Sequence, residues 1–139
     1  MRPGHGRAHR LHPMKAPPHE GTGINVRGVH HVNVLVTDVA EAVRFYTDVL
    51  GLAEAPRPDL GPGAWLQLGG EQIHLSHTAD RPPESFQHFA IHVDDVDAAV
   101  EHIRGAGWPV DPIPLIAGAG HQAFLRDPSG NLIELNQPE

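Results

Sequence analysis

The chain has 139 residues, enough for one domain with its own hydrophobic core, and its apolar and charged fractions of 40% and 19% are typical of a globular protein. It contains no cysteine, which excludes disulfides, thiolate metal sites and thiol chemistry. It also has no run of about 18 apolar residues and no signal-peptide core. We therefore expect no membrane partner and a cytoplasmic location.

The net charge of −7 is unevenly distributed along the chain. Residues 1–27 carry a net charge of +4, so the remainder carries −11. An acidic folded part argues against nucleic acid as a partner, because phosphate binding needs a basic surface. Residues 1–27 are rich in histidine, proline and glycine and show no apolar periodicity, which predicts a disordered basic tail. The folded domain is predicted over residues 28–139.

The first half of that domain, residues 28–78, predicts one mixed unit of strands and a helix. A strand is expected over 31–37, and Asp38 follows where a helix N-cap belongs. Apolar residues then recur at helical spacing, and a short strand is expected over 52–56. The stretch AWLQLGGEQIHLS reads as two strands joined by a Gly-Gly turn.

The second half, residues 86–137, follows a linker at 79–85 and predicts the same elements in the same order. A strand over 88–94 leads to a second N-cap, Asp95, and to a second amphipathic helix. A short strand is expected over 108–111. The stretch QAFLRDPSGNLIELN then predicts two strands joined by an Asp-Pro-Ser-Gly turn.

The two halves align as an internal repeat. His88 stands 57 residues after His31, and the two strand–helix segments align from these histidines without a gap. The last strands also align, with His74 opposite Glu134. The predicted fold class is therefore α+β, built from two βαβββ modules at 28–78 and 86–137.

Four equivalent polar residues lie on otherwise apolar first and last strands: His31, His74, His88 and Glu134. A pseudo-twofold relation between the modules would bring them around one centre. Three imidazoles and a carboxylate are a suitable ligand set for a divalent metal. Burying any one of them without a partner would cost several kcal/mol. The repeat therefore predicts one metal site with these four ligands, and Ni, Co, Zn, Mn and Fe remain open.

Strand alternation separates the other histidines from this set. His30 and His77 have the wrong parity to share a face with the predicted ligands. His92 has the right parity, but it is four residues from His88, about 13 Å along a strand. It is therefore too far for the same ion, although it can line a pocket.

The sequence resembles the vicinal oxygen chelate superfamily, which includes glyoxalase I, extradiol dioxygenases and bleomycin resistance proteins. The stretches that carry the resemblance are GVHHVNVLVTDVAEAVRFYTDVLGL, EQIHLS, HFAIHVDDVDAAVEHIRGAG and FLRDPSGNLIEL. The resemblance implies that the two modules form a cupped mixed sheet around a metal. It places the ligands at the same four residues that the repeat selects. It also implies a homodimer, in which the site is formed either within one chain or between two.

The resemblance further implies a small-molecule substrate that offers two adjacent oxygens to the metal. The residues expected to line the substrate pocket are Trp65, Gln67, His92, His121 and Phe124. Trp65 and Phe124 are equally compatible with a place in the core.

Three functions are compatible with this family. The first is a glyoxalase-I-like lyase or isomerase with Glu134 as metal ligand and catalytic base, although His74 stands where glyoxalase I has Glu. The second is an Fe(II) extradiol-type dioxygenase that uses His31, His88 and Glu134 as its triad, with His74 as an acid–base group. The third is a metal-free antibiotic-binding resistance protein, which the presence of all four ligand residues disfavours.

Overall fold

The computed structural model describes residues 23–139, and the chain divides into two units, Met1–His30 and His31–Glu139. In the first unit, residues 23–30 form no helix or strand. The predicted disordered tail, residues 1–27, lies outside the described residues except for 23–27. Among the described residues, no helix is long and apolar enough to cross a lipid bilayer.

The second unit contains the same series of elements twice. The first series is β1 (His31–Val36), α1 (Val39–Arg44), the π-helical turn η2 (Phe45–Val49), β2 (Ala53–Ala55), β3 (Gly63–Leu68) and β4 (Glu71–His77). The second series is β5 (His88–His92), α2 (Val96–Gly105), β6 (Asp111–Pro112), β7 (His121–Arg126) and β8 (Leu132–Gln137). We call the two series module 1 and module 2.

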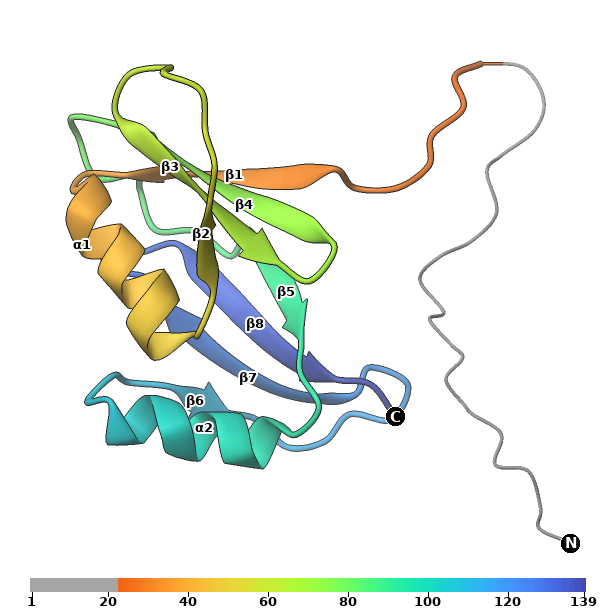
Figure 1. Cartoon of the computed structure of the whole chain (residues 1–139). Coiled ribbons are helices and arrows are strands. Elements are labelled where there is room, and N and C mark those ends of the chain that lie inside the picture. Colours follow the sequence, from red (N-terminus) through yellow and green to blue (C-terminus); the bar gives the residue numbers. More distant parts are fainter. Residues whose placement is uncertain (1–22) are drawn as a thin grey trace, which may run out of the picture. The chain divides into compact units, whose positions relative to one another are not determined.

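Each module forms a four-stranded mixed sheet (Figure 1). The strand order is β1-β4-β3-β2 in one sheet and β5-β8-β7-β6 in the other. In both sheets the first strand runs parallel to the last, and the remaining neighbours are antiparallel. The predicted α+β class with two βαβββ modules is thus confirmed. The first strand, β1 or β5, lies at one edge of its sheet.

One hydrophobic core joins the two modules. Its buried residues come from both sheets and both helices, and they include Val36, Ala42, Val100 and Ile133. Because side chains alternate along a strand, burying Val34 and Val36 directs His31 to the opposite, open face of its sheet. The two sheets therefore each have one core face and one open face.

The helices begin as the sequence predicts. The Asp38 carboxylate accepts a hydrogen bond from the Glu41 N–H at 3.0 Å, and the Asp95 carboxylate accepts one from the Ala98 N–H at 3.0 Å. The first helix departs from the predicted regular pattern, because its second half widens into η2. The Thr47 hydroxyl, which donates to the Val43 carbonyl at 2.8 Å, contributes to this local change since such back-bonding bends helices.

The short strand of module 2 lies later than predicted, at Asp111–Pro112 instead of 108–111. The reason is Trp108, whose ring packs against Phe45 and whose indole N–H donates to the Arg126 carbonyl at 2.8 Å. These contacts hold the segment as a loop that closes the core.

Candidate metal centre

The first pair of predicted ligands, His31 and His74, lies on the open face of the module 1 sheet. Their rings stack with centroids 3.9 Å apart and an angle of 22° between the ring planes. The indole of Trp65 stacks on His74, at 4.2 Å and 7°. The Nε2 atom of His74 lies 2.9 Å from Oε1 of Gln72. His74 is thus held between two rings, which restricts the direction of its ring nitrogens.

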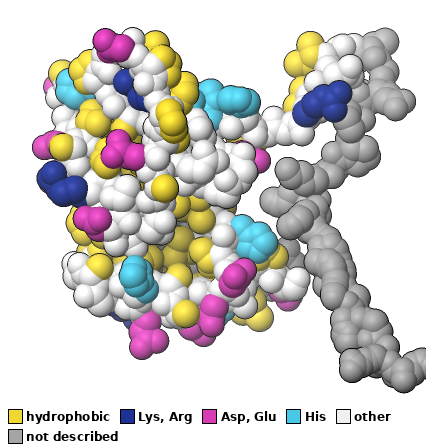
Figure 2. All heavy atoms as spheres, in the orientation of Figure 1, with side chains coloured by type: hydrophobic (Ala, Val, Ile, Leu, Met, Phe, Trp, Pro, Cys, Tyr) yellow, Lys and Arg dark blue, Asp and Glu magenta, His cyan; other side chains and the backbone are white. Residues whose placement is uncertain are grey.

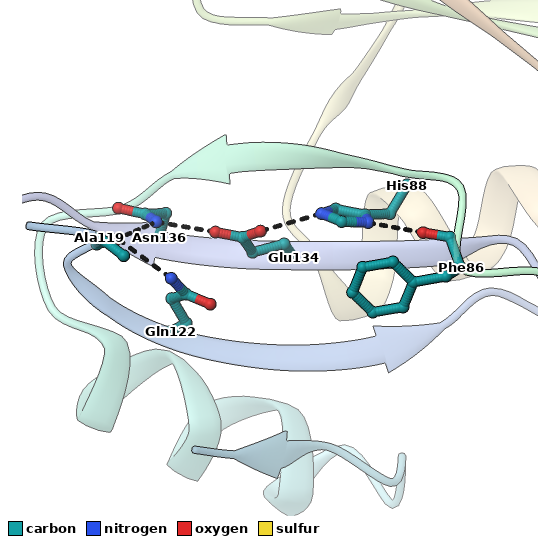
Figure 3. A network of polar contacts seen from close by, with 6 residues as sticks. All are labelled: Phe86, His88, Ala119, Gln122, Glu134 and Asn136. Atoms are coloured by element: carbon teal, nitrogen blue, oxygen red, sulfur yellow. Dashed lines mark hydrogen bonds and ion pairs between the residues drawn. The ribbon is translucent and has the colours of Figure 1, made fainter. Parts of the chain in front are cut away.

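The second pair, His88 and Glu134, lies on the open face of the module 2 sheet (Figure 3). The Nε2 atom of His88 is 3.0 Å from Oε1 of Glu134, and its Nδ1 is 2.8 Å from the Phe86 carbonyl oxygen. The other carboxylate oxygen of Glu134 accepts a hydrogen bond from the side-chain amide of Asn136 at 2.7 Å. Both members of the pair are therefore oriented by further hydrogen bonds.

These contacts orient the imidazole of the module 2 pair. The Phe86 carbonyl only accepts, so Nδ1 of His88 carries a proton and donates it. The Nε2 atom faces a carboxylate oxygen of Glu134 at 3.0 Å. Imidazole nitrogen and carboxylate oxygen are both atoms that bind divalent metals. The bond from Nδ1 to a backbone carbonyl is the arrangement that directs Nε2 of a histidine to a metal.

The two pairs occupy equivalent places in their sheets. His74 lies opposite Asn33, two residues after His31, and Glu134 lies opposite Ala90, two residues after His88. The aromatic neighbours follow the same rule, since Trp65 is the register partner of His74 and Phe124 is the partner of Glu134. The repeat seen in the sequence is therefore also a repeat of strand register.

The structure brings the four predicted ligands together as two pairs instead of one cluster. In residues 23–139, no group of three or more His, Cys, Asp or Glu side chains is placed to hold one metal ion. The donor set has suitable chemistry for a divalent metal, but each module of one chain supplies only half of it.

Four of the five residues predicted to line the substrate pocket lie on the open faces of the two sheets. Trp65 and Gln67 share the open face of module 1, where the Gln67 amide donates to the Gly69 carbonyl at 2.8 Å. Phe124 lies beside the module 2 pair, with its ring edge-on to His88 at 5.6 Å. His92 is exposed near the end of β5, on the face that carries His88.

His121 lies apart from the other predicted pocket residues. Its Nε2 is 3.7 Å from the Asp97 carboxylate on α2. Its neighbour Gln122 is the register partner of Asn136, so His121 points to the opposite face of β7.

Polar side-chain contacts connect the modules. The Tyr46 hydroxyl donates to the Asp127 carboxylate at 2.8 Å, and the side-chain amide of Asn131 donates to the Leu35 carbonyl at 2.9 Å. Burial, followed by the charge and hydrogen bond of Asp127, raises the pKa of Tyr46 well above its usual value. The Asp-Pro-Ser-Gly turn predicted from the sequence therefore also holds module 1 against module 2.

Asn136 is the residue of the site that sequence reasoning missed. It orients the Glu134 carboxylate, and its position two residues later on the same strand face was the available signal. The Phe86 contribution is a backbone carbonyl, which no side-chain pattern could have indicated.

Comparison with known proteins identifies the family. Residues 28–135 match the family described as the Glyoxalase/Bleomycin resistance protein/Dioxygenase superfamily. The chain belongs to this superfamily. A probable lactoylglutathione lyase of Vibrio cholerae is 33% identical over 123 residues, covering 77% of this chain and 88% of that protein.

Solved structures of the superfamily have the same fold. TnmS3, an antibiotic binding protein from Streptomyces sp. CB03234, is 30% identical and aligns with a TM-score of 0.71 over 84% of this chain and 100% of its own. The fosfomycin resistance protein FosX from Listeria monocytogenes is 20% identical and aligns with a TM-score of 0.72, covering 82% of this chain and 94% of its own. At that identity FosX supports the fold alone.

Proposed function

We propose that this superfamily member is a metal-dependent, glyoxalase-I-like lyase or isomerase acting on a small substrate with two adjacent oxygens. The observation that carries the proposal is the equivalent register of two ligand pairs on the open faces of the two sheets. The similarity to the probable lactoylglutathione lyase of Vibrio cholerae supports this class of reaction.

The metal centre is completed by a second copy of the chain in this proposal. One chain presents His31 with His74 and His88 with Glu134, and the two pairs do not form one cluster among the described residues. In a homodimer, module 1 of one copy can face module 2 of the other. Each of two sites would then receive three imidazoles and one carboxylate.

In this proposal, residues of module 2 transfer the substrate proton. When bound, the metal supplies Lewis-acid stabilisation of negative charge on the substrate oxygens. Glu134 takes a proton from the carbon next to the carbonyl and returns it to the neighbouring carbon. Asn136 donates to one oxygen of that carboxylate and orients it, while the other oxygen faces His88. The Phe86 carbonyl keeps His88 in the tautomer that presents Nε2 to the site.

The first experiment combines metal analysis with assays on the full chain purified without a histidine tag. Protein loaded with nickel, cobalt or zinc should convert thiol adducts of 2-oxoaldehydes to hydroxyacyl thioesters. Oxygen uptake with catechols by the iron-loaded protein would instead indicate the extradiol-type dioxygenase. Absence of both activities under metal saturation contradicts the proposal.

The second experiment tests whether the site is shared between copies. One variant carries H31A and H74A, the other carries H88A and E134A, and each is inactive alone. A mixed dimer has one site without ligands and one site with all four, so it should recover about half of the activity of the wild-type dimer. A site formed within one chain predicts no recovery on mixing.

The antibiotic-binding alternative has one observation in its favour, the 30% identity to TnmS3. It predicts that the purified protein retains no divalent metal and that a bound small molecule does not depend on His88. The H88A variant therefore separates the two functions, since it should lose both metal and activity if the enzyme proposal is correct.

A further inference from the structure

A hollow beside the module 1 pair has an unusual lining for an acidic protein. It has a volume of about 430 Å³, and its polar lining residues are Asn33, Arg57, His74, Ser76 and His77. No carboxylate is among its lining residues, although residues 28–139 carry a net charge of −11. Acidic side chains are scattered over the visible face of the folded unit (Figure 2). An anion bound in this hollow would therefore meet no repulsion from a lining carboxylate.

Arg57 reaches this hollow from the loop between β2 and β3. A glycine makes room for it, because a Cβ atom at Gly63 would lie 2.7 Å from Nη2 of Arg57 and 2.5 Å from the Leu75 carbonyl oxygen. Gly63 is two residues before Trp65, so both face the open side of the sheet. The guanidinium therefore lies about 7 Å along the strand from the row formed by Trp65 and His74.

The guanidinium retains hydrogen-bonding capacity. Its Nη1 donates to the Gly61 carbonyl at 2.8 Å, whereas its Nε is buried without an acceptor. Its Nη2 makes no hydrogen bond to a described residue. Unlike Nε, it is not fully buried. The ion pairs of the described residues, His88–Glu134 and His121–Asp97, do not include Arg57. Its charge is therefore not neutralised by a carboxylate in residues 23–139.

We propose that Arg57 binds a carboxylate group of the substrate beside the module 1 pair. A guanidinium is always charged and offers donors in a planar fork that matches a carboxylate. The separation of about 7 Å corresponds to a few bonds between that carboxylate and the two oxygens that would face His31 and His74. The substrate class is then a small hydroxycarbonyl or dicarbonyl acid, and this last step rests on the proposed function.

The competing interpretation is that Arg57 only braces its loop through the Gly61 carbonyl. The test uses malonate and its uncharged analogue malonamide as probes of the ¹⁵N-labelled full chain, as purified and after chelator treatment. The indole N–H signal of Trp65 reports the hollow. The indole of Trp108, bound to the Arg126 carbonyl, serves as an internal reference.

Malonate should shift the Trp65 signal saturably without moving the Trp108 signal, and malonamide should not. R57Q should weaken malonate binding by about tenfold to a hundredfold, because hydrogen bonds to charged groups are the strong ones. The malonate affinity of R57K should lie between those of R57Q and the wild type, since a lysine keeps the charge but not the planar fork.

Arg81 provides a matched control. It also packs against a glycine, with Nη2 2.7 Å from a Cβ placed at Gly130, and it donates to the Pro128 carbonyl at 3.4 Å. It does not line the hollow. R81Q should therefore leave malonate binding unchanged.

Two results would overturn the inference: no saturable shift in the wild type, or equal malonate affinity in R57Q and wild type. A lower melting temperature of R57Q with unchanged affinity assigns Arg57 to loop bracing alone. The binding readout needs neither metal nor turnover. Loss of malonate binding in R57Q combined with an inactive wild type would leave Arg57 as a carboxylate site and reject the proposed reaction.

Discussion

Modules 1 and 2 differ more in the chemistry of their ligand pairs than in their geometry. Both pairs follow the same register, with the second member opposite the residue two positions after the first. Module 1 presents two imidazoles stacked at 3.9 Å, with an indole on the outer face of one. Module 2 presents an imidazole and a carboxylate 3.0 Å apart.

Two copies of one structural unit thus carry different side chains at equivalent positions. The shared backbone register determines where the side chains project, and the side chain alone determines what each position can do. In the proposed enzyme, only the module 2 pair offers a carboxylate that can accept a proton from carbon. Module 1 offers two imidazoles and, beside them, the hollow that Arg57 lines.

The largest expected effect distinguishes the two last-strand ligands. In the proposed enzyme, E134Q should lower turnover by about 10²- to 10⁴-fold, the usual contribution of a general base, and excess metal should not restore it. H74Q is the matched variant in module 1, and excess metal should restore part of its activity. Steady-state kinetics across a metal titration measures both, and an E134Q variant with near-normal turnover would remove Glu134 from the base role.

The next effect tests whether both modules serve one ion. A metal at 100 times its dissociation constant should stabilise the wild-type protein by about 2.7 kcal/mol, because only the folded state binds it. H31A and H88A should each abolish this gain. Thermal unfolding with and without a chelator measures the gain, and a normal metal-dependent shift in H31A would leave module 1 outside the metal site.

The connection between the modules should contribute a smaller amount. Y46F removes the hydrogen bond to Asp127 and should lower the free energy of unfolding by about 1–3 kcal/mol. The pKa of Tyr46 is raised in the folded state, so its stabilising contribution is complete below about pH 10 and is lost as the pH rises above that value. Denaturant unfolding of wild type and Y46F from pH 8 upward should therefore converge at alkaline pH, and parallel curves would contradict this assignment.

The smallest effect compares the two helix starts. D38A and D95A should each cost about 1 kcal/mol, because each removes an N-cap bond of 3.0 Å. Equal losses of unfolding free energy in chemical denaturation would show that the two N-caps are equivalent in energy as well as in geometry. A much smaller loss for D38A would show that the shorter helix α1 depends on packing and not on its cap.

Much of the fold could be predicted because its signals are local. Asp38 and Asp95 start their helices as expected, since an N-cap needs only a short side chain next to the first turn. The short strand of module 2 was predicted too early, because its position depends on Trp108 reaching Phe45 and Arg126, which are distant in sequence. The π-helical turn η2 also depends on surroundings that a periodic pattern does not contain.

The candidate site was also predicted only in part from the sequence. The repeat predicted one centre formed by His31, His74, His88 and Glu134, whereas the structure places them as two pairs, each on the open face of one sheet. Strand parity did not show that the two pairs of one chain remain apart, nor that Arg57 would lie over Gly63. Such placements follow from how sheets and loops pack.

The sequence by itself determined the two modules, their helix starts and the strand faces on which the four candidate ligands lie. These features follow from the alternation of side chains along strands and from helix capping, which depend only on residues close together in the sequence. Only the tertiary structure decided that Tyr46 and Asp127 join the modules, that the two ligand pairs stay separate within one chain, and that an arginine is placed in the hollow beside one of them. Those outcomes depend on contacts between residues far apart in the chain, which form only where the whole core packs.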